Sequence, residues 1–347
     1  MSAQYLPRRT VLASAGAIGV GGLLAACSSE PEAPSAPPTG PALEAPTPVA
    51  YDEQLEPVIS QIHDAVAEAD KARDAKKLAP RVTGSALEFR TKNYEMIAKV
   101  PEWADHLKTP SADLMLPITS VGAEFPRVAI ALVADSSDSG VPFFVALQQA
   151  DARSPYVTWG WAQQAVGVEM PAVEDQAVGS EPVAYEQDGL VMTPKAALEL
   201  YAKVLSDGDA ADPDDKLAPN PLQTEKHQNI GQERKELNAG VEWDEVATIK
   251  ERFTVKEGEF LGLRTNDGGA LVMATLMSTR TVTVKEGASM SYGEDNVYTK
   301  LVGRKKFTKS FVREFGTVVA LHIPAAEAGG QVQPIGATMS VLGASGS

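Results

Sequence analysis

A tetrapeptide that occurs twice is the feature that most restricts how this chain can fold. Lys-Leu-Ala-Pro stands at residues 77–80 and again at 216–219, an offset of 139 residues. Apolar positions of helical spacing precede both copies and align at the same offset: Ile59 with Leu198, Ile62 with Tyr201, and Val66 with Leu205. A match in position as well as in sequence predicts an internal duplication, with two halves of similar design.

The first half changes its periodicity from helix-like to strand-like. Residues 52–73 carry apolar side chains at spacings of three and four, which predicts an amphipathic helix. Ser85 and Glu88 form a capping-box pattern that predicts the start of a second helix, ending before Pro101. From Phe125 onward the pattern is typical of strands. The predicted strands are residues 128–133, 141–147 and 156–161.

The second half repeats this order. Thr193 and Pro194 predict the start of a helix, and a weaker helical stretch covers 222–239. Strand-like runs follow at 246–255, 259–264, 270–277, 279–285, 306–315, 317–323 and 331–342. Helices followed by antiparallel strands, twice over, predict an α+β fold with two tandem domains at 51–171 and 190–347. The acidic, aperiodic stretch 172–189 is the predicted linker.

The N-terminus has the layout of an export signal. Arg8 and Arg9 precede an apolar run that ends in Leu24-Ala25-Ala26-Cys27. An uncleaved membrane anchor is the alternative. The apolar run is short for a span of about 20 residues, however, and four glycines dilute it.

These residues resemble a twin-arginine signal followed by the lipobox of bacterial lipoproteins. Pro7 and Val11 depart from the usual twin-arginine pattern, which leaves the general export route as the alternative. The lipobox resemblance implies cleavage after residue 26, a diacylglyceryl group on Cys27 and a further acyl chain such as palmitate. Residues 1–26 would then be the signal peptide and 27–50 a lipidated, Pro-rich tether on the extracytoplasmic face of the cell membrane.

Composition excludes several classes of function. Cys27 is the only cysteine, so a lipidated chain has no thiol for a disulfide or for a Cys-ligated metal. The net charge of −15 argues against nucleic acid as a partner. No cofactor-binding motif and no metal-ligand spacing occurs in the sequence.

No catalytic motif occurs in the sequence either. The four histidines, His63, His106, His227 and His322, are scattered and are expected at boundary positions. Residues 207–212 resemble a calcium loop, but Ala211 stands at a required ligand position, and a solvated acidic loop is expected instead.

Two groups of residues are candidates for binding. Trp159 and Trp161, two apart on a predicted strand, are expected on one face, where they would stack on a ligand or fill the core. Lys305, Lys309 and Arg313 would share a strand face that meets anionic surfaces. The alternative is that these cations protect an exposed edge strand.

The order of elements resembles the cystatin-like roll of nuclear transport factor 2-like domains, and also the two-domain lipoproteins of actinobacteria. The resemblance covers residues 52–345 and supplies no functional residues. The sequence favours a non-catalytic, membrane-tethered module that binds an envelope protein or a small ligand. The alternatives are an enzyme with its pocket inside a roll, and an accessory or chaperone-like factor for envelope assembly.

Overall fold

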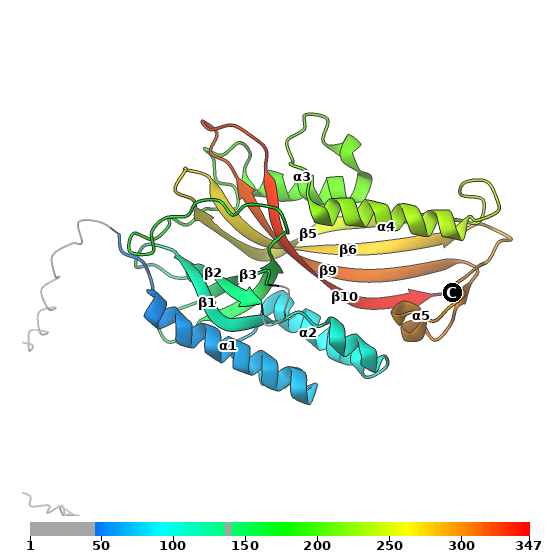
Figure 1. Cartoon of the computed structure of the whole chain (residues 1–347), viewed down its shortest axis with the longest axis horizontal. Coiled ribbons are helices and arrows are strands. Elements are labelled where there is room, and N and C mark those ends of the chain that lie inside the picture. The colour runs from blue at the N-terminus through cyan, green and yellow to red at the C-terminus, as the bar shows by residue number, and fades with distance from the viewer. Residues whose placement is uncertain (1–45, 136–139) are drawn as a thin grey trace, which may run out of the picture. The chain divides into compact units, whose positions relative to one another are not determined.

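The computed structural model describes residues 46–135 and 140–347, which lie within one compact unit, Ala45–Ser347. Helices and two four-stranded antiparallel sheets make up this unit, which confirms the α+β fold class (Figure 1). In each half the helices come first and the sheet follows, as the sequence predicts.

The first half contains two α-helices, two short 3-10 helices and a sheet whose strands are neighbours in chain order. Its helices are α1 (Asp52–Ala72), η1 (Ala75–Leu78), α2 (Gly84–Ile97) and η2 (Pro101–His106). Its strands are β1 (Pro110–Thr119), β2 (Arg127–Asp135), β3 (Phe143–Gln149) and β4 (Val157–Gln163). The apolar stripe of α1 is buried, and α1 packs against β1.

The second half repeats this plan around longer strands, in the order β10-β9-β6-β5. Its helices are α3 (Pro194–Asp207), η3 (Asp209–Ala211) and α4 (Pro221–Leu237). Its long strands are β5 (Ala247–Arg264), β6 (Ala270–Val284), β9 (Ser310–Ile323) and β10 (Gln333–Gly346). An insertion between β6 and β9 carries β7 (Met290–Ser291), α5 (Val297–Val302) and β8 (Lys306–Phe307).

The repeated positions have equivalent surroundings. All six aligned helix residues are buried, three in the core of the first half and three in that of the second. Leu78 and Leu217 of the repeated tetrapeptide are buried in the same two cores. Both sheets are meanders in chain order once the insertion is set aside. These facts support the duplication.

Several predicted elements have different bounds. Strand β1, which contains Pro110 and Pro117, was not predicted. The runs predicted at 246–255 and 259–264 form the single strand β5 (Ala247–Arg264), because a bulge between Val255 and Phe260 accommodates the Glu-Gly pair that looks like a turn. Residues 270–284 form the single strand β6. The helix α5, which lies inside the insertion, was also not predicted.

The predicted capping box at Ser85 and Glu88 is wrong. Helix α2 begins at Gly84, and its N-cap residue, Thr83, makes no side-chain cap. The carboxylate of Glu259, on the β5 bulge, accepts hydrogen bonds from the backbone N–H of Ser85 (2.8 Å) and from its hydroxyl. Glu88 instead receives a hydrogen bond from Lys256 (2.7 Å). A distant strand therefore supplies the cap.

The two halves share an apolar cluster. Phe89, Phe144 and Trp159 of the first half pack with Met273 and Ile335 of the second. Residues 172–189 contain no helix or strand, but they form isolated bridges with Ser120, Leu263 and Thr265. The division into domains at 51–171 and 190–347 stays a prediction.

Candidate functional site

The structure does not bring the two candidate tryptophans together. A bulge in β4 shifts the register between its pairs with Ala146 and Leu147, and Trp159 is the extra residue. One inserted residue reverses the alternation of faces. Trp159 accordingly packs in the cluster shared by the two halves, whereas Trp161 packs in the core with α1. The expectation that both lie on one face is wrong.

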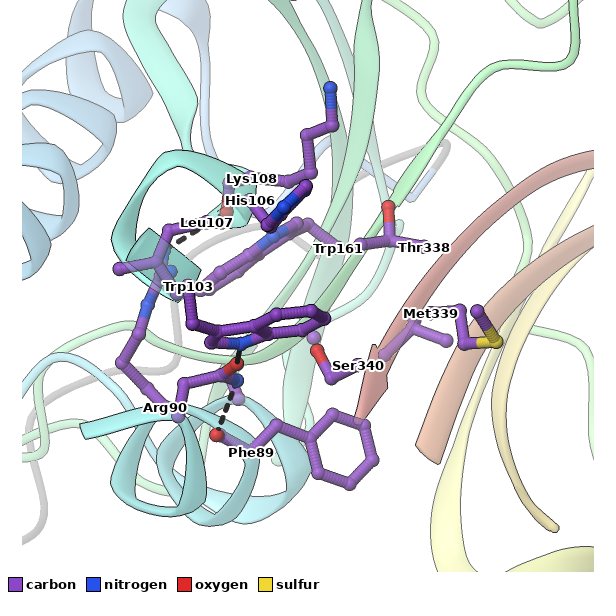
Figure 2. A pocket seen from close by; sticks show the side chains of 14 residues that line it. Phe89, Arg90, Trp103, His106, Leu107, Lys108, Trp161, Thr338, Met339 and Ser340 are labelled. Atoms are coloured by element: carbon purple, nitrogen blue, oxygen red, sulfur yellow. Dashed lines mark hydrogen bonds between the residues drawn. The ribbon is translucent and has the colours of Figure 1, made fainter. Parts of the chain in front are cut away.

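Trp161 lines a small pocket between α2, η2, β4 and β10 (Figure 2). The guanidinium of Arg90 lies 5.4 Å from the centroid of the Trp161 ring and donates to the carbonyl of Lys108 (2.9 Å). Burial lowers the pKa of Arg90, which the nearby Asp70 opposes. Trp103, which also lines the pocket, donates to the Asn93 side chain (2.6 Å). The pocket therefore has aromatic walls and a buried cation.

The size of this pocket limits what it can hold. Its volume is about 40 Å³. A buried water needs roughly 10–15 Å³, and a typical ligand site has about 300–1,000 Å³. The pocket has room for a few waters or one small group, which is too little for a principal ligand site.

A large hollow lies along the outer strand of the second sheet. It has a volume of about 760 Å³ and runs between α3 and the bulge of β5 at residues 256–259. A second hollow, of about 450 Å³, lies between the end of α3, α4 and β5. Both are lined by Ser206, Asp207 and Arg252, so they adjoin. We call the two together the β5 groove; its walls α3 and α4 lie over the second sheet in Figure 1.

Each part of the β5 groove has aromatic side chains. In the larger part Tyr185 and Phe260 meet edge to face, with ring centroids 5.2 Å apart. In the smaller part Trp243 is 56% exposed, and the guanidinium of Arg234 lies 4.6 Å from its ring centroid. Exposed aromatic surface of this kind is common at binding sites.

Charged side chains of the groove are held by partners. Arg252 is 3.6 Å from Asp207, and Lys195 is 2.7 Å from Glu186. Lys256 contacts Glu88 and Glu259. Burial alone would lower the pKa of Lys256, but the hydrogen bond to Glu88 and the charge of Glu259 outweigh it and raise the pKa. His227 also lines the groove, and its Nε2 is buried without a hydrogen-bond partner among the described residues.

The predicted basic face does not form. Lys305 lies between α5 and β8 and contacts Asp295 (3.3 Å), and Lys309 is exposed between β8 and β9. Arg313, on β9, is buried and donates through Nη2 to both oxygens of Glu233 on α4 (2.8 and 2.9 Å). Sequence could not reveal this partner, which is 80 residues away.

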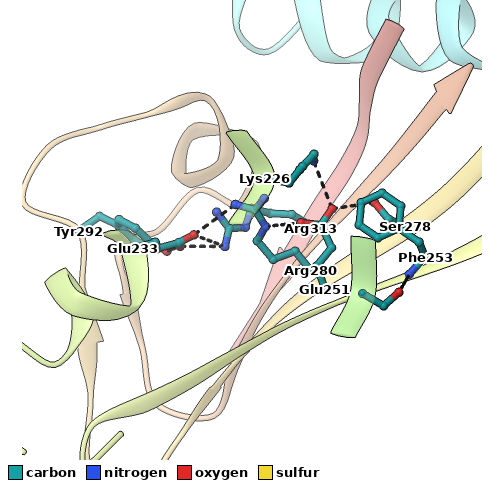
Figure 3. Close-up of polar contacts among 9 residues, drawn as sticks. Lys226, Glu233, Glu251, Phe253, Ser278, Arg280, Tyr292 and Arg313 are labelled. Atoms are coloured by element: carbon teal, nitrogen blue, oxygen red, sulfur yellow. Dashed lines mark hydrogen bonds and ion pairs between the residues drawn. The ribbon is translucent and has the colours of Figure 1, made fainter. Parts of the chain in front are cut away.

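Arg313 belongs to a buried ionic network between α4 and the second sheet (Figure 3). Glu251 on β5 accepts hydrogen bonds from Ser278 (2.8 Å) and Arg280 (2.7 Å) and lies 3.3 Å from the ammonium of Lys226. Burial would raise the pKa of Glu251, but Lys226 and Arg280 outweigh it and lower the pKa. Burial lowers the pKa of Lys226 more than Glu251 raises it. The network fixes the middle of β5 against α4.

Tyrosine and histidine side chains meet carboxylates at three places. Tyr94 donates to Asp70 and Tyr292 donates to Glu233, both at 2.6 Å, while His322 Nε2 lies 3.8 Å from Asp267. None of these residues lines the β5 groove or the Trp161 pocket. Across residues 46–135 and 140–347, no three His, Cys, Asp or Glu side chains are grouped so as to hold a metal ion.

The N-terminal candidates, Arg8, Arg9, Leu24, Ala25, Ala26 and Cys27, lie outside the described residues. Within the part that the structure describes, no helix is long and apolar enough to cross a membrane.

The residues of the β5 groove were not predicted as a site from the sequence. The alternation Ile249-Lys250-Glu251-Arg252-Phe253 was a usable signal, because cations on alternate residues are typical of protected edge strands.

Comparison with known proteins gives one match. The model of a family described as a domain of unknown function (DUF8094) matches residues 46–346. No curated protein and no solved structure matches the chain.

Proposed function

We propose that this chain, which belongs to the DUF8094 family, is a lipid-anchored binding module at the outer face of the bacterial cell membrane. The lipobox at Leu24–Cys27 and the Pro-rich residues 28–50 support the anchor and the tether. The β5 groove supports the binding role. It is the site at which an envelope protein or a small ligand would be recognised.

One observation carries the binding role, namely the size and lining of the β5 groove. A volume of about 760 Å³ lies within the usual range for ligand sites. The aromatic pair Tyr185 and Phe260 offers apolar contact area, and Lys195, Arg252 and Lys256 place charged groups around it. Charges around an apolar surface favour selective recognition.

The anchor is tested by Cys27→Ala. The wild-type protein should take up labelled palmitate and sediment with membranes, whereas the variant should do neither. Equal membrane association of the two proteins, at the same mature mass, would show that Cys27 is not the anchor.

The groove is tested by photo-crosslinking in intact cells. A photoreactive amino acid replaces Trp243 in the groove, and the control position is Met115 on β1, which has a matched exposure of 58% against 56%. Position 243 should give discrete adducts that are lost in the Cys27→Ala background, and position 115 should not. The same adducts from both positions, or none from either, would contradict binding in the groove.

A further inference from the structure

Strand β5 is at the edge of the second sheet, and parts of its outer edge are covered. At one end the side chain of Asn238 donates to the carbonyl of Ala247 (3.0 Å) and accepts from its N–H (3.2 Å). Further along, the N–H of Phe253 donates to the hydroxyl of Ser206 (2.8 Å). Beyond the bulge, Val183 donates to the carbonyl of Gly262 (2.8 Å). Side chains and a passing segment thus occupy the positions of a neighbouring strand.

Between Ala247 and Phe253 the edge is open. The register of β5 with β6 is unbroken from Ala247 to Val255, so backbone groups point alternately toward β6 and away from it. The backbone N–H and C=O groups of Ala247 and Phe253 point away from β6, and therefore those of Ile249 and Glu251 do too. No group in residues 46–135 or 140–347 makes a hydrogen bond with the outward N–H or C=O of these two residues. The six steps between the covered ends span about 20 Å.

This open edge lies in the smaller part of the β5 groove, which Ile249 and Glu251 line with Trp243 and His227. It is also rigid, because the Glu251 side chain is held by Lys226, Ser278 and Arg280 (Figure 3). A rigid edge costs a ligand little ordering entropy. An extended peptide can add a strand to a sheet edge whose backbone groups are unpaired, with its alternate side chains in neighbouring pockets.

Charge decides which segment fits. Lys250 and Arg252 are exposed on the face of the strand opposite to Glu251, and both line the groove. A second copy of β5, paired antiparallel about Lys250 or Glu251, would place a lysine or an arginine opposite Lys250, and like charges directly opposite on paired strands are destabilising. Acidic residues at those positions are attracted instead. The alternate residues of such a segment would face Ile230 and Trp243, which suit apolar side chains.

We propose that an extended peptide segment of a partner protein, with acidic and apolar residues in alternation, pairs with β5 at Ile249 and Glu251. The inference rests on the proposed function and names the class of partner for the same groove. The segment completes the sheet as an outer strand and presents its acidic side chains to Lys250 and Arg252.

The test uses hydrogen–deuterium exchange of the full chain with a defined pool of peptides. Each peptide has the pattern X-Glu-X-Glu-X, where X is Val, Ile, Leu, Phe or Tyr. The amides of Ile249 and Glu251 should exchange quickly in the free protein and slow about tenfold or more with the pool. The amides of Lys250 and Arg252 bond to β6 and should be slow throughout, which makes them the internal control.

Matched reagents separate pairing from simple charge attraction. The same peptides with N-methylated backbones, which lack N–H donors, should give no protection. Lys250→Glu should weaken peptide binding by about tenfold or more, since an attraction becomes a repulsion. Lys309→Glu makes the same charge change outside the groove and should leave binding unaltered.

Three outcomes would overturn the inference. No protection at Ile249 and Glu251 with millimolar pool would exclude strand addition. Equal binding by the N-methylated peptides would show that backbone pairing is not involved. Protection that rises with protein concentration alone would make a second copy the occupant. If position 243 still gives crosslinks in cells in any of these cases, the binding module stands and only the peptide class is wrong.

Discussion

Glu259 on β5 caps helix α2 by accepting hydrogen bonds from both the backbone N–H and the hydroxyl of Ser85, a residue 174 positions earlier in the chain. The same carboxylate accepts from Thr275 (2.8 Å) and lies 3.2 Å from the ammonium of Lys256. Ser85 is fully buried. The start of a first-half helix therefore depends on a side chain of the second half.

Removing this carboxylate should destabilise the fold. Glu259→Ala leaves the Ser85 N–H, the Ser85 hydroxyl and the Thr275 hydroxyl without their acceptor, at a cost of about 2–3 kcal/mol in the free energy of unfolding. Chemical denaturation measures the loss. Glu257→Ala, on the exposed part of the same bulge, is the control and should change stability by less than about 0.5 kcal/mol. Equal stabilities would show that the cap contributes nothing.

The ionic network under α4 should be sensitive to loss of either sign of charge. Glu251→Gln leaves Lys226 and Arg280 buried without their counter-charge, and we expect a loss of about 3 kcal/mol or more. The pKa of Glu251 lies below its ordinary value, so its contribution is present above about pH 4.3 and disappears as the pH falls through the lower, folded-state pKa. Between pH 3 and 7, the free energy of unfolding of the variant should therefore fall less steeply on acidification than that of the wild type. The same acid slope in both proteins would contradict this assignment.

A second pH dependence of stability is expected from His322, in this case from burial of a neutral side chain rather than from an ion pair. Burial lowers the pKa of His322, although Asp267 opposes the shift. Between that lowered pKa and about 6.5 the unfolded chain binds a proton that the folded chain does not, so stability rises with pH through this interval. His322→Gln should flatten the profile just below pH 6.5. An unchanged slope in His322→Gln would exclude this histidine as its source.

The shared apolar cluster predicts that the described part of the chain unfolds in one step. Phe144→Ala removes a fully buried ring that packs with residues of both halves, at a cost of about 3–5 kcal/mol. In a Trp243→Phe background the remaining tryptophans, Trp103, Trp159 and Trp161, all lie in the first half, so their fluorescence reports on that half, and hydrogen exchange of β9 reports on the second. Both signals should shift together. Phe125→Ala, on an exposed ring, is the control. If the two halves unfolded in separate transitions and Phe144→Ala shifted only one of them, the result would support independent domains at 51–171 and 190–347.

Local periodicity was sufficient to predict the α+β class and the helices α1 and α3. Their buried residues recur at helical spacing, and burial of one stripe leaves a pattern that a single sequence displays. The strands were harder to delimit. The bulge in β5 contains a Glu-Gly pair that is typical of a turn, and only pairing with β6 shows that the strand continues.

The candidate site depended on contacts between distant segments. One extra residue in β4 puts Trp159 and Trp161 in different cores. The residue types at this position did not predict the bulge. Arg313 looked like an exposed cation because Glu233, its partner, lies on a helix far away in sequence. The β5 groove exists because α3 and α4 lie along one strand. Hydrophobic periodicity does not predict which helix packs beside which strand.

The cap from Glu259 to Ser85 has a consequence for how relatives of this protein can diverge. Helix α4 is capped by its own N-cap residue, Asn220, whereas the cap of α2 is supplied by Glu259 from a distant strand. Gly84 has a positive φ of 52°, and a methyl group there would come within 2.7 Å of the Glu259 carboxylate. A methyl group at position 84 would also come within 2.9 Å of the Cβ of Trp159, so a change at 259 alone would not make room for it. At position 85 the cap needs a donor that reaches the Glu259 carboxylate, so we expect positions 85 and 259 to vary together, and recombination between them would separate a helix from its cap.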